Sequence, residues 1–353
     1  MSTPPKRRVR VLVVDDSVLN RRAITTRLQA TGEVDVVARA ADGAEALKLV
    51  HDVRPDVITL DLEMPKMDGF SFLRLLMATR PTPVIVVSSY SQKENVFRAL
   101  ELGAVDFVAK PDAGGVDAVE VLDGLCQKVL GFGAERAVNV RPSVLPPAPK
   151  PRGGAVATES RSPPRWLVAI AASTGGPSAL SELFARLSER GSYAVVLAQH
   201  MPERFTRTFA ERLDRKSSLR VSEAIDGDLV TAHTGFVCPG RQCMEVHAQS
   251  GGQLRIKLMP QGPEDRYAPS GNRLLTSVAV AAKTRAIGVI LTGMGDDGTE
   301  GARAIIEAGG IVIAESEDTA VIYGMPGSAV RAGWVTRSLP LSQIADQLDE
   351  LIR

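Results

Sequence analysis

The stretch at residues 166–177, WLVAIAASTGGP, predicts how the second half of the chain folds. Its apolar run, residues 167–172, is typical of a strand that is buried on both faces of a parallel sheet. The polar turn that follows, residues 173–176, ends the strand, and the proline after it suits the first turn of a helix. Such a turn lies at the carboxyl end of a strand, where open α/β sheets bind ligands, so it can expose the Ser173 hydroxyl beside backbone amides. The same turn is also compatible with an ordinary helix cap.

The composition excludes several classes of protein. A chain of 353 residues is long enough for two domains with separate cores. The net charge of +1 gives no field that would recruit nucleic acid. No apolar run approaches the length of a membrane span, and the basic residues at 6–10 lack the apolar segment of a secretion signal. Three cysteines without zinc spacing (Cys126, Cys238 and Cys243) favour a reducing compartment. We therefore expect a cytoplasmic two-domain α/β protein with no nucleic-acid partner and no direct membrane insertion.

Apolar strands alternate with amphipathic helical stretches through the first 130 residues. The expected strands are residues 9–14, 34–39, 57–60, 83–87 and 105–109. Helical patterns open near Val18, Gly43, Gly69, Ser91 and Val116. Five strand–helix units at short spacing predict a doubly wound parallel sheet with right-handed crossovers.

Polar side chains follow four of these strands where each one ends. They are Asp15 and Asp16 after the first, Asp61 after the third, Ser88 after the fourth and Lys110 after the fifth. Three carboxylates that converge in one crevice repel one another unless a hard cation such as Mg²⁺ joins them. Any single carboxylate could also serve only as a helix cap. The full set favours a crevice for phosphoryl chemistry.

Four segments carry a resemblance to a known family: VLVVDDS (11–17), DLEMPKMDG (61–69), PVIVVSS (83–89) and GAVDFVAKP (103–111). They are similar to the signatures of a two-component receiver domain, which implies a flavodoxin-like fold. The resemblance implies Asp61 as the phosphoacceptor. It also implies Mg²⁺ as cofactor, held by Asp61, Asp15, Asp16 and the backbone carbonyl of Glu63.

The same resemblance implies how the phosphoryl group is held and sensed. Ser88 and Lys110 would bind it, a histidine kinase would donate it, and Phe107 stands at the switch position, where many receivers carry tyrosine. Since phenylalanine has no hydroxyl, a switch at Phe107 must use ring packing alone.

The segment at residues 141–165, RPSVLPPAPKPRGGAVATESRSPPR, has seven prolines and few large apolar side chains. Such a composition cannot pack a core and predicts an extended linker, although a proline-motif ligand is the alternative. We therefore expect a receiver domain at residues 1–133, a flexible proline-rich linker at 134–164, and a second folded domain at 165–353.

The second domain again places polar residues at strand ends. Apolar strands at residues 193–198 and 286–291 are followed by His200 and by the loop of residues 292–298, and turn-rich residues 219–258 predict antiparallel hairpins. Ser173, His200 and the Asp296–Asp297 pair therefore share one edge of a parallel sheet. A histidine can take the proton of a serine while a carboxylate orients it. We expect a larger doubly wound α/β hydrolytic domain with a β-hairpin region.

The loop of residues 293–298 also fits the G-x-G-x-x-G pattern of dinucleotide sites, with Glu315 at the distance of a ribose ligand. Two carboxylates inside the loop would repel a pyrophosphate at a helix N-terminus, so this alternative is disfavoured.

Five segments of the second domain resemble the chemotaxis receptor methylesterase, or protein-glutamate methylesterase, family: ASTGGP (172–177), QHMPERFTRTFAERL (199–213), EAIDGD (223–228), LTGMGDDG (291–298) and YGMP (323–326). The resemblance implies Ser173 as nucleophile, His200 as base and Asp297 rather than Asp296 as the orienting acid. The Met294 amide, with Thr174 nearby, would form the oxyanion site, with no cofactor in this domain.

The implied activity is phosphorylation-activated hydrolysis of glutamate γ-methyl esters on methyl-accepting chemoreceptors, which releases methanol, together with deamidation of receptor glutamines. Two segments depart from the family pattern: Cys243 replaces a usual histidine, and residues 267–275, YAPSGNRLL, replace a sequence close to H-x-P-S-V-D-x-L-F. These departures leave open a substrate outside chemotaxis, or a response regulator whose second domain only binds a partner.

Overall fold

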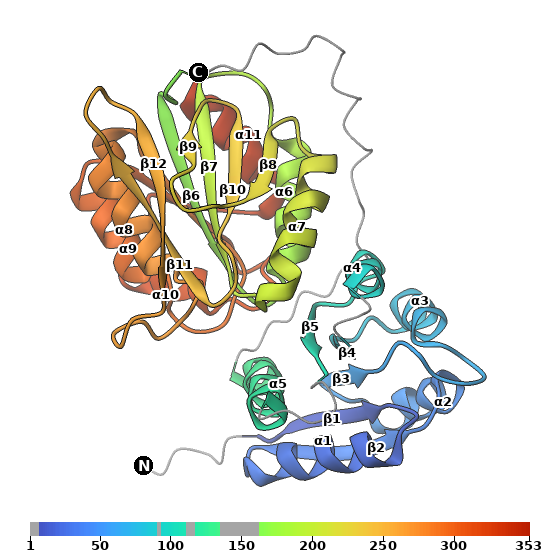
Figure 1. Ribbon diagram of the computed structural model, residues 1–353. Coiled ribbons are helices and arrows are strands. Elements are labelled where there is room, and N and C mark those ends of the chain that lie inside the picture. The colour runs from blue at the N-terminus through green and yellow to red at the C-terminus, as the bar shows by residue number, and fades with distance from the viewer. Residues whose placement is uncertain (1–6, 90–92, 111–116, 135–161) are drawn as a thin grey trace, which may run out of the picture. The chain divides into compact units, whose positions relative to one another are not determined.

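The computed structural model describes residues 7–89, 93–110, 117–134 and 162–353. The chain divides into two compact units, residues 1–144 and 145–353, and each is described by itself (Figure 1). Most of the expected linker lies outside the described residues, so the limits at 133, 134, 164 and 165 stay predictions.

The first unit is a five-stranded sheet in the order β2-β1-β3-β4-β5, and every strand pair in it is parallel. Three helices begin at a side chain that accepts a backbone N–H: Ser17, Asp42 and Asp68. The elements are β1 Val9–Val14, α1 Val18–Ala30, β2 Val34–Ala40, α2 Gly43–Val53, β3 Val57–Leu60, α3 Gly69–Thr79, β4 Val84–Ser88, α4 Lys93–Glu101, β5 Asp106–Ala109 and α5 Asp117–Ala134. This confirms the doubly wound sheet and its flavodoxin-like order.

The second unit contains a larger parallel sheet of seven strands in the order β15-β14-β13-β6-β7-β10-β8, together with a three-stranded sheet in the order β11-β12-β9. Its first half comprises β6 Trp166–Ala172, α6 Gly176–Arg186, β7 Tyr193–Gln199, α7 Glu203–Lys216, β8 Arg220–Glu223, β9 Leu229–Val230, β10 Thr234–Val237, β11 Gln242–Ala248 and β12 Leu254–Pro260. Its second half comprises α8 Gly271–Ala282, the 3-10 turn η2 Lys283–Arg285, β13 Ala286–Ile290, α9 Thr299–Glu307, β14 Ile311–Glu315, α10 Met325–Arg331, β15 Arg337–Leu339 and α11 Leu341–Ile352. The short strand β15 was not expected.

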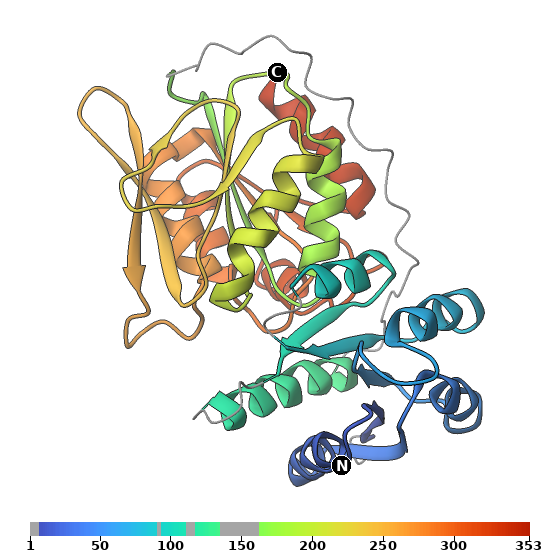
Figure 2. The ribbon, with the colours of Figure 1, turned by 45° about the vertical axis from the view of Figure 1, so that its right-hand side comes forward.

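Helices cover both faces of the seven-stranded sheet. Helices α6, α7 and α11 pack together on one face, and α8 and α9 lie on the other (Figures 1 and 2). The α8 and α9 face closes a core with the apolar side chains of β6, β13 and the hairpin strands, among them Leu167, Ile256, Leu275, Ile290 and Ile305. This core holds β6 and β13 in place, and the polar loops described below follow these strands at their carboxyl ends.

The hairpin expectation was right for only part of residues 219–258. Strands β11 and β12 form an antiparallel pair to which β9 adds. By contrast, β8 and β10 are parallel strands of the seven-stranded sheet, and β10 is buried along its whole length. The turn residues between these short strands suggested hairpins, but burial of β10 beside β7 decides its direction.

Among the described residues, no helix is both long enough and apolar enough to cross a membrane.

Candidate functional site

Ser173 lies directly after β6 on a tight turn into α6. Its amide donates to the carbonyl of Thr292 at 3.0 Å, which ties the turn to the end of β13. Gly175 has φ +82°, and a Cβ on it would lie 2.8 Å from Val321 and 3.0 Å from Thr292. A side chain at residue 175 would therefore clash, so the sequence STGGP is what lets the chain turn this sharply.

His200 follows β7, the neighbour of β6 in the sheet. Its Nδ1 lies 3.1 Å from the Ser173 hydroxyl oxygen, and its Nε2 lies 2.7 Å from Oδ2 of Asp297. A carboxylate can only accept, so the proton is on Nε2 and the Nδ1 lone pair faces Ser173. The side chain of Gln199 holds both loops by donating to the carbonyls of Ser173 and His200.

Asp297 is completely buried, and its oxygens accept from the amides of Gly271 at 2.6 Å and Asn272 at 2.8 Å. Burial opposes its charge, but the hydrogen bond and charge of His200 and these amides outweigh it and lower the pKa of Asp297. Asp296 is exposed and pairs with Arg266 at 3.3 Å. Of the two neighbouring acids, Asp297 is therefore the one that contacts His200.

The loop after β13 also passes close to the serine. A Cβ on Gly293 would lie 2.8 Å from Cβ of Ser173, so no larger residue fits there. Among the described residues, the amide of Met294 has no acceptor. Thr174 is buried beside Ser173, and its hydroxyl lacks a hydrogen-bond partner within the described chain. The two groups predicted to form an oxyanion site, the amide of the residue after Gly293 and the Thr174 hydroxyl, therefore have no acceptor among the described residues.

The sequence did not predict several residues that contact the site. The amides of Gly271 and Asn272 hold Asp297, and the ring of Tyr267 stacks on His200. The one available signal is the departure of residues 267–275 from the family pattern, which bears on the choice of substrate but does not predict a contact with His200.

Glu315 was the ribose ligand of the dinucleotide alternative. It is 1% exposed, and its Oε2 accepts from the amide of Thr292 at 2.8 Å. Burial raises the pKa of Glu315 to about 7. A ribose hydroxyl cannot reach this carboxyl, so the geometry disfavours a dinucleotide site.

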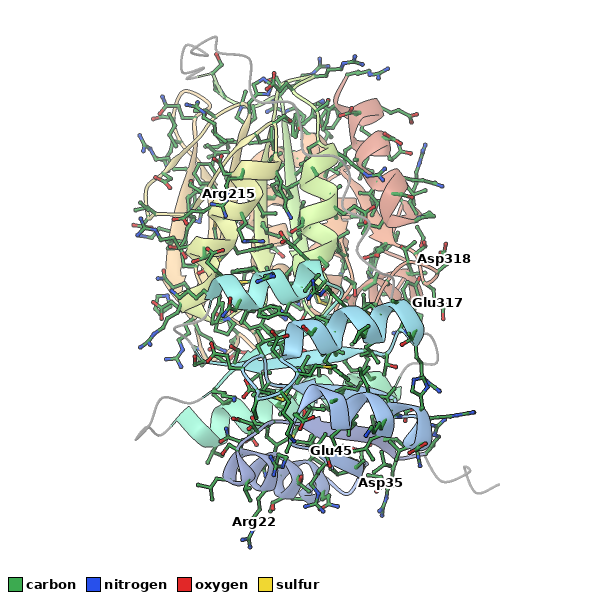
Figure 3. The ribbon with its side chains drawn as sticks, turned by 90° about the vertical axis from the view of Figure 1, so that its right-hand side faces the viewer. Arg22, Asp35, Glu45, Arg215, Glu317 and Asp318 are labelled. Carbon is green, nitrogen blue, oxygen red and sulfur yellow. The ribbon has the colours of Figure 1, made fainter. Side chains whose placement is uncertain are left out.

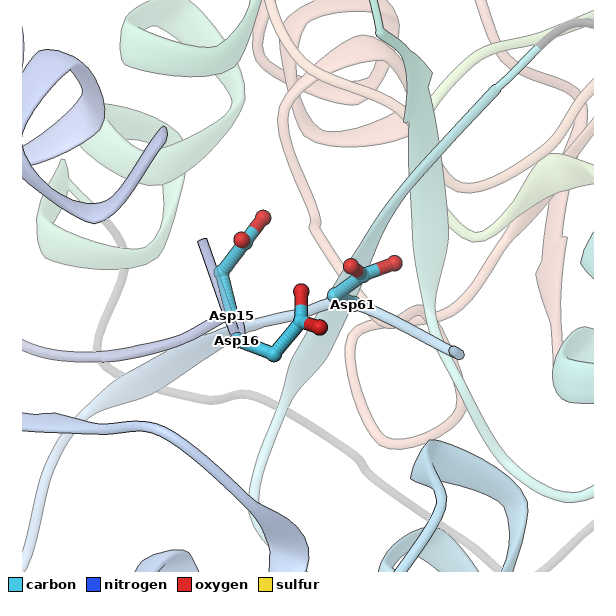
Figure 4. Close-up of side chains that lie close together, drawn as sticks. All are labelled: Asp15, Asp16 and Asp61. Atoms are coloured by element: carbon cyan, nitrogen blue, oxygen red, sulfur yellow. The ribbon is translucent and has the colours of Figure 1, made fainter. Parts of the chain in front are cut away.

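In the first unit, Asp15, Asp16 and Asp61 converge at the carboxyl edge of β1 and β3 (Figure 4). One oxygen of each lies within 4.8 Å of the others. Lys110 bridges two of them, with Nζ 2.7 Å from Asp61 and 3.1 Å from Asp15. Burial raises the pKa of Asp61 in spite of Lys110 and with help from the charge of Asp15. Burial also opposes the charge of Lys110, but its carboxylate partners prevail and raise the pKa of Lys110.

The three carboxylates fit a hard divalent cation, because they offer only oxygen donors at close range. Glu63 follows closely, and its amide contacts Oδ1 of Asp61 at 3.5 Å. Whether its carbonyl is a ligand stays a prediction.

The expected phosphoryl-binding and switch residues occupy the neighbouring strands. Ser88 is fully buried at the end of β4, and its carbonyl accepts from the amide of Lys110 at 2.7 Å. Phe107 in β5 is buried and meets Phe97 of α4 edge to face, with ring centroids 6.3 Å apart. The structure thus brings Ser88 and Lys110 to the same edge of the sheet, and Phe107 is buried in the core of the first unit.

Two family models match the chain. The receiver model for response regulators matches residues 11–116, and the CheB methylesterase model matches residues 168–348. A protein-glutamate methylesterase/protein-glutamine glutaminase of Myxococcus xanthus is 49% identical over 346 residues, covering 98% of this chain and 97% of the relative. One from Geobacter sulfurreducens is 45% identical over 363 residues, covering 97% of each chain.

A solved structure supports the same assignment for the second unit. The CheB methylesterase catalytic domain of Thermotoga maritima is 37% identical, with a TM-score of 0.52, and it covers 54% of this chain and 100% of its own. The receiver family model matches the first unit and the methylesterase family model matches the second, and the relatives align over nearly the whole chain. The chain therefore belongs to the family of CheB methylesterases that carry a receiver domain.

Proposed function

We propose that this chain hydrolyses glutamate γ-methyl esters on methyl-accepting chemoreceptors, and that phosphorylation of Asp61 raises the rate. The observation that carries the proposal is the hydrogen-bonded chain from Ser173 through His200 to the buried Asp297. The curated relatives are named as methylesterases and glutaminases of protein glutamate and glutamine, which supports this substrate class.

In the first half of the reaction, Nδ1 of His200 takes the hydroxyl proton as Oγ of Ser173 attacks the ester carbonyl. Asp297 stabilises the imidazolium that forms. The Met294 amide and the Thr174 hydroxyl donate to the oxyanion, and one such donor contributes about 3 kcal/mol. His200 then gives the proton to the departing methoxide, and methanol leaves a glutamyl ester on Ser173.

In the second half, His200 takes a proton from water, and the hydroxide attacks the glutamyl–Ser173 ester. The proton returns to Oγ of Ser173, and the products are free glutamate side chain and restored serine. A glutamine would follow the same path with ammonia as the leaving group, which accounts for deamidation by the same residues.

The receiver supplies the proposed control. A histidine kinase of the chemotaxis system would phosphorylate Asp61, and Lys110 and Ser88 would hold the phosphoryl oxygens. Mg²⁺ bound by Asp15, Asp16, Asp61 and the Glu63 carbonyl would neutralise phosphoryl charge. Repacking around Phe107 would pass on the change.

Gating also assigns a role to the domain order, with a receiver at residues 1–133, a linker at 134–164 and a catalytic domain at 165–353. We expect the unphosphorylated receiver to restrict access to Ser173. Moving such a switch almost completely takes about 5.5 kcal/mol of differential stabilisation. A fragment of residues 160–353 should then be faster than the unphosphorylated full chain, and an equal rate would refute autoinhibition.

We also propose a cytoplasmic location, which the free, buried state of Cys126, Cys238 and Cys243 supports.

The experiment is methanol release from receptor carrying labelled methyl esters. Ser173→Ala should lower the rate by roughly 10⁴-fold or more, because it removes the hydroxyl that forms the acyl-enzyme. Ser178→Ala, near the start of the same helix, is the matched control and should keep wild-type activity. Release that survives Ser173→Ala would refute the serine mechanism. No release from wild type or from the 160–353 fragment would refute the receptor substrate.

A further inference from the structure

An aromatic ring covers one face of the histidine that we assign as base. The ring centroids of Tyr267 and His200 lie 4.7 Å apart, and their planes differ by 16°, so the rings are stacked. Arg266 approaches the Tyr267 ring at 5.4 Å and pairs with Asp296 at the loop after β13. The Tyr267 hydroxyl reaches the same loop, because a Cβ on Gly295 would lie 2.6 Å from it.

Contacts with β11 and α8 hold the segment that carries Tyr267 in place. Its carbonyl accepts from the thiol of Cys243 in β11 at 3.8 Å. Two residues earlier, Asp265 accepts from Arg273 of α8 at 2.6 Å, and Arg273 also binds Glu245 of β11 at 2.9 Å. The two departures from the family pattern, Cys243 and residues 267–275, are therefore in contact. Cys243 donates to the backbone carbonyl of Tyr267, and the side-chain ring of Tyr267 covers His200.

We propose that Tyr267 is a positioning residue whose ring fixes the plane of the His200 imidazole, so that Nδ1 faces Ser173 while Nε2 faces Asp297. The second torsion of a histidine is broad, so hydrogen bonds at the two ends leave the ring free to tilt. The bond to Ser173 breaks during each turnover, whereas proton transfer at Nδ1 takes place in the plane of the ring and leaves its stacked face on Tyr267 intact. The stack therefore keeps the base aligned while its proton moves.

The stack also suits the charged form of the base. When His200 takes the serine proton, its positive charge lies over the electron-rich face of a phenol ring. Burial raises the pKa of Tyr267, and Asp296 and Asp297 add to the effect against the opposing charge of Arg266. The phenol thus stays neutral at the pH values at which a histidine base works.

This inference rests on the proposed function, because the proposed function assigns His200 as the base. Two readouts distinguish a failure of the inference from a failure of the proposed function. The first is the rate at which a small fluorophosphonate labels Ser173 in the full chain without receptor. The second is hydrogen exchange of the His200 Nε2–H proton, followed by NMR with ¹⁵N-labelled histidine. The variants are Tyr267→Leu, which removes the ring, and Tyr267→Phe, which keeps it, with Arg266→Gln as the control for the outer cation.

We expect Tyr267→Leu to slow labelling by about 10- to 100-fold, because small misplacements of reacting groups are costly. We also expect its Nε2–H proton to exchange faster, whereas Tyr267→Phe and Arg266→Gln match wild type in both readouts. Thermal unfolding checks that Tyr267→Leu is folded. Equal exchange rates in wild type and Tyr267→Leu would overturn the inference, whatever the labelling shows. A wild type that is not labelled, with exchange still faster in Tyr267→Leu, would refute the serine mechanism and uphold the inference.

Discussion

Asp61 and Asp297 are buried aspartates at the carboxyl edges of two parallel sheets, yet their charges are handled in opposite ways. The pKa of Asp61 is raised, because burial and the neighbouring Asp15 outweigh Lys110. The pKa of Asp297 is lowered, because His200 and two backbone amides outweigh burial. The difference lies in the donors that face each carboxylate.

The contrast corresponds to two kinds of chemistry. Asp297 accepts from His200 and from two backbone amides that are fixed in place, which favours its charged form as the partner of His200. Asp61 faces the ammonium group of Lys110 and the like charge of Asp15, an environment that suits the cation and the phosphoryl group of the proposed function. Under the proposed function, one edge keeps a constant charge, and charge is added to and removed from the other.

The largest effect should follow from removing the fixed charge. Asp297→Asn should lower the rate of methanol release by roughly 10⁴-fold, because the amide favours the wrong tautomer of His200. Asp296→Asn is the matched control, since Asp296 is exposed and contacts Arg266 rather than His200. Similar losses in both variants would contradict the separate roles.

A smaller loss should follow when a neutral donor at the catalytic edge is removed. Thr174→Val keeps the shape of the side chain but deletes the buried hydroxyl, and should lower kcat by about 10²- to 10³-fold. Thr299→Val is the control, because the Thr299 hydroxyl is also buried and has no partner among the described residues. An unchanged kcat in Thr174→Val would exclude this hydroxyl from the oxyanion site.

Glu315 extends the comparison to a carboxyl with one amide donor and no ion pair among the described residues. Its pKa is raised by burial from an ordinary 4.5 to about 7, so between these values the folded chain binds the proton that the unfolded chain has lost. The carboxyl therefore lowers the free energy of unfolding increasingly from about pH 4.5 to 7, and fully above that. Glu315→Gln should stabilise the second unit by roughly 2 to 3 kcal/mol at pH 8.

Calorimetry at pH 4 and pH 8 checks this prediction, because the advantage of Glu315→Gln should disappear at the lower pH. Glu317→Gln is the control on the same loop, where Glu317 is exposed (Figure 3). Equal stabilisation at both pH values would contradict the assigned ionisation.

The sequence was sufficient for the elements that repeat a simple pattern. Buried strands such as β6 and β13 are continuous apolar runs, and the polar residues that follow them predicted Ser173, His200, Asp61 and Lys110 at the sheet edges. The geometry agrees in placing Ser173, His200 and Asp297 in contact. Their roles in catalysis stay proposals that the experiments above test.

Other features depend on contacts between distant loops, for which no periodic signal exists. The amides of Gly271 and Asn272 hold Asp297 through the backbone, and any residue type could supply them. The stack of Tyr267 on His200 joins residues 67 positions apart in the sequence. The parallel direction of β8 and β10 is likewise set by the neighbouring strand β7 and not by their own sequence.

The central claim is that charge added at Asp61 controls chemistry at Ser173. The most direct test is methanol release from methylated receptor by wild type, Asp61→Asn and Asp35→Asn, each with and without a small phosphodonor and Mg²⁺. Asp35 is an exposed aspartate of the same domain and serves as control (Figure 3). We predict that the phosphodonor accelerates wild type and Asp35→Asn but leaves Asp61→Asn unchanged. Equal acceleration of all three proteins, or of none, would contradict the account.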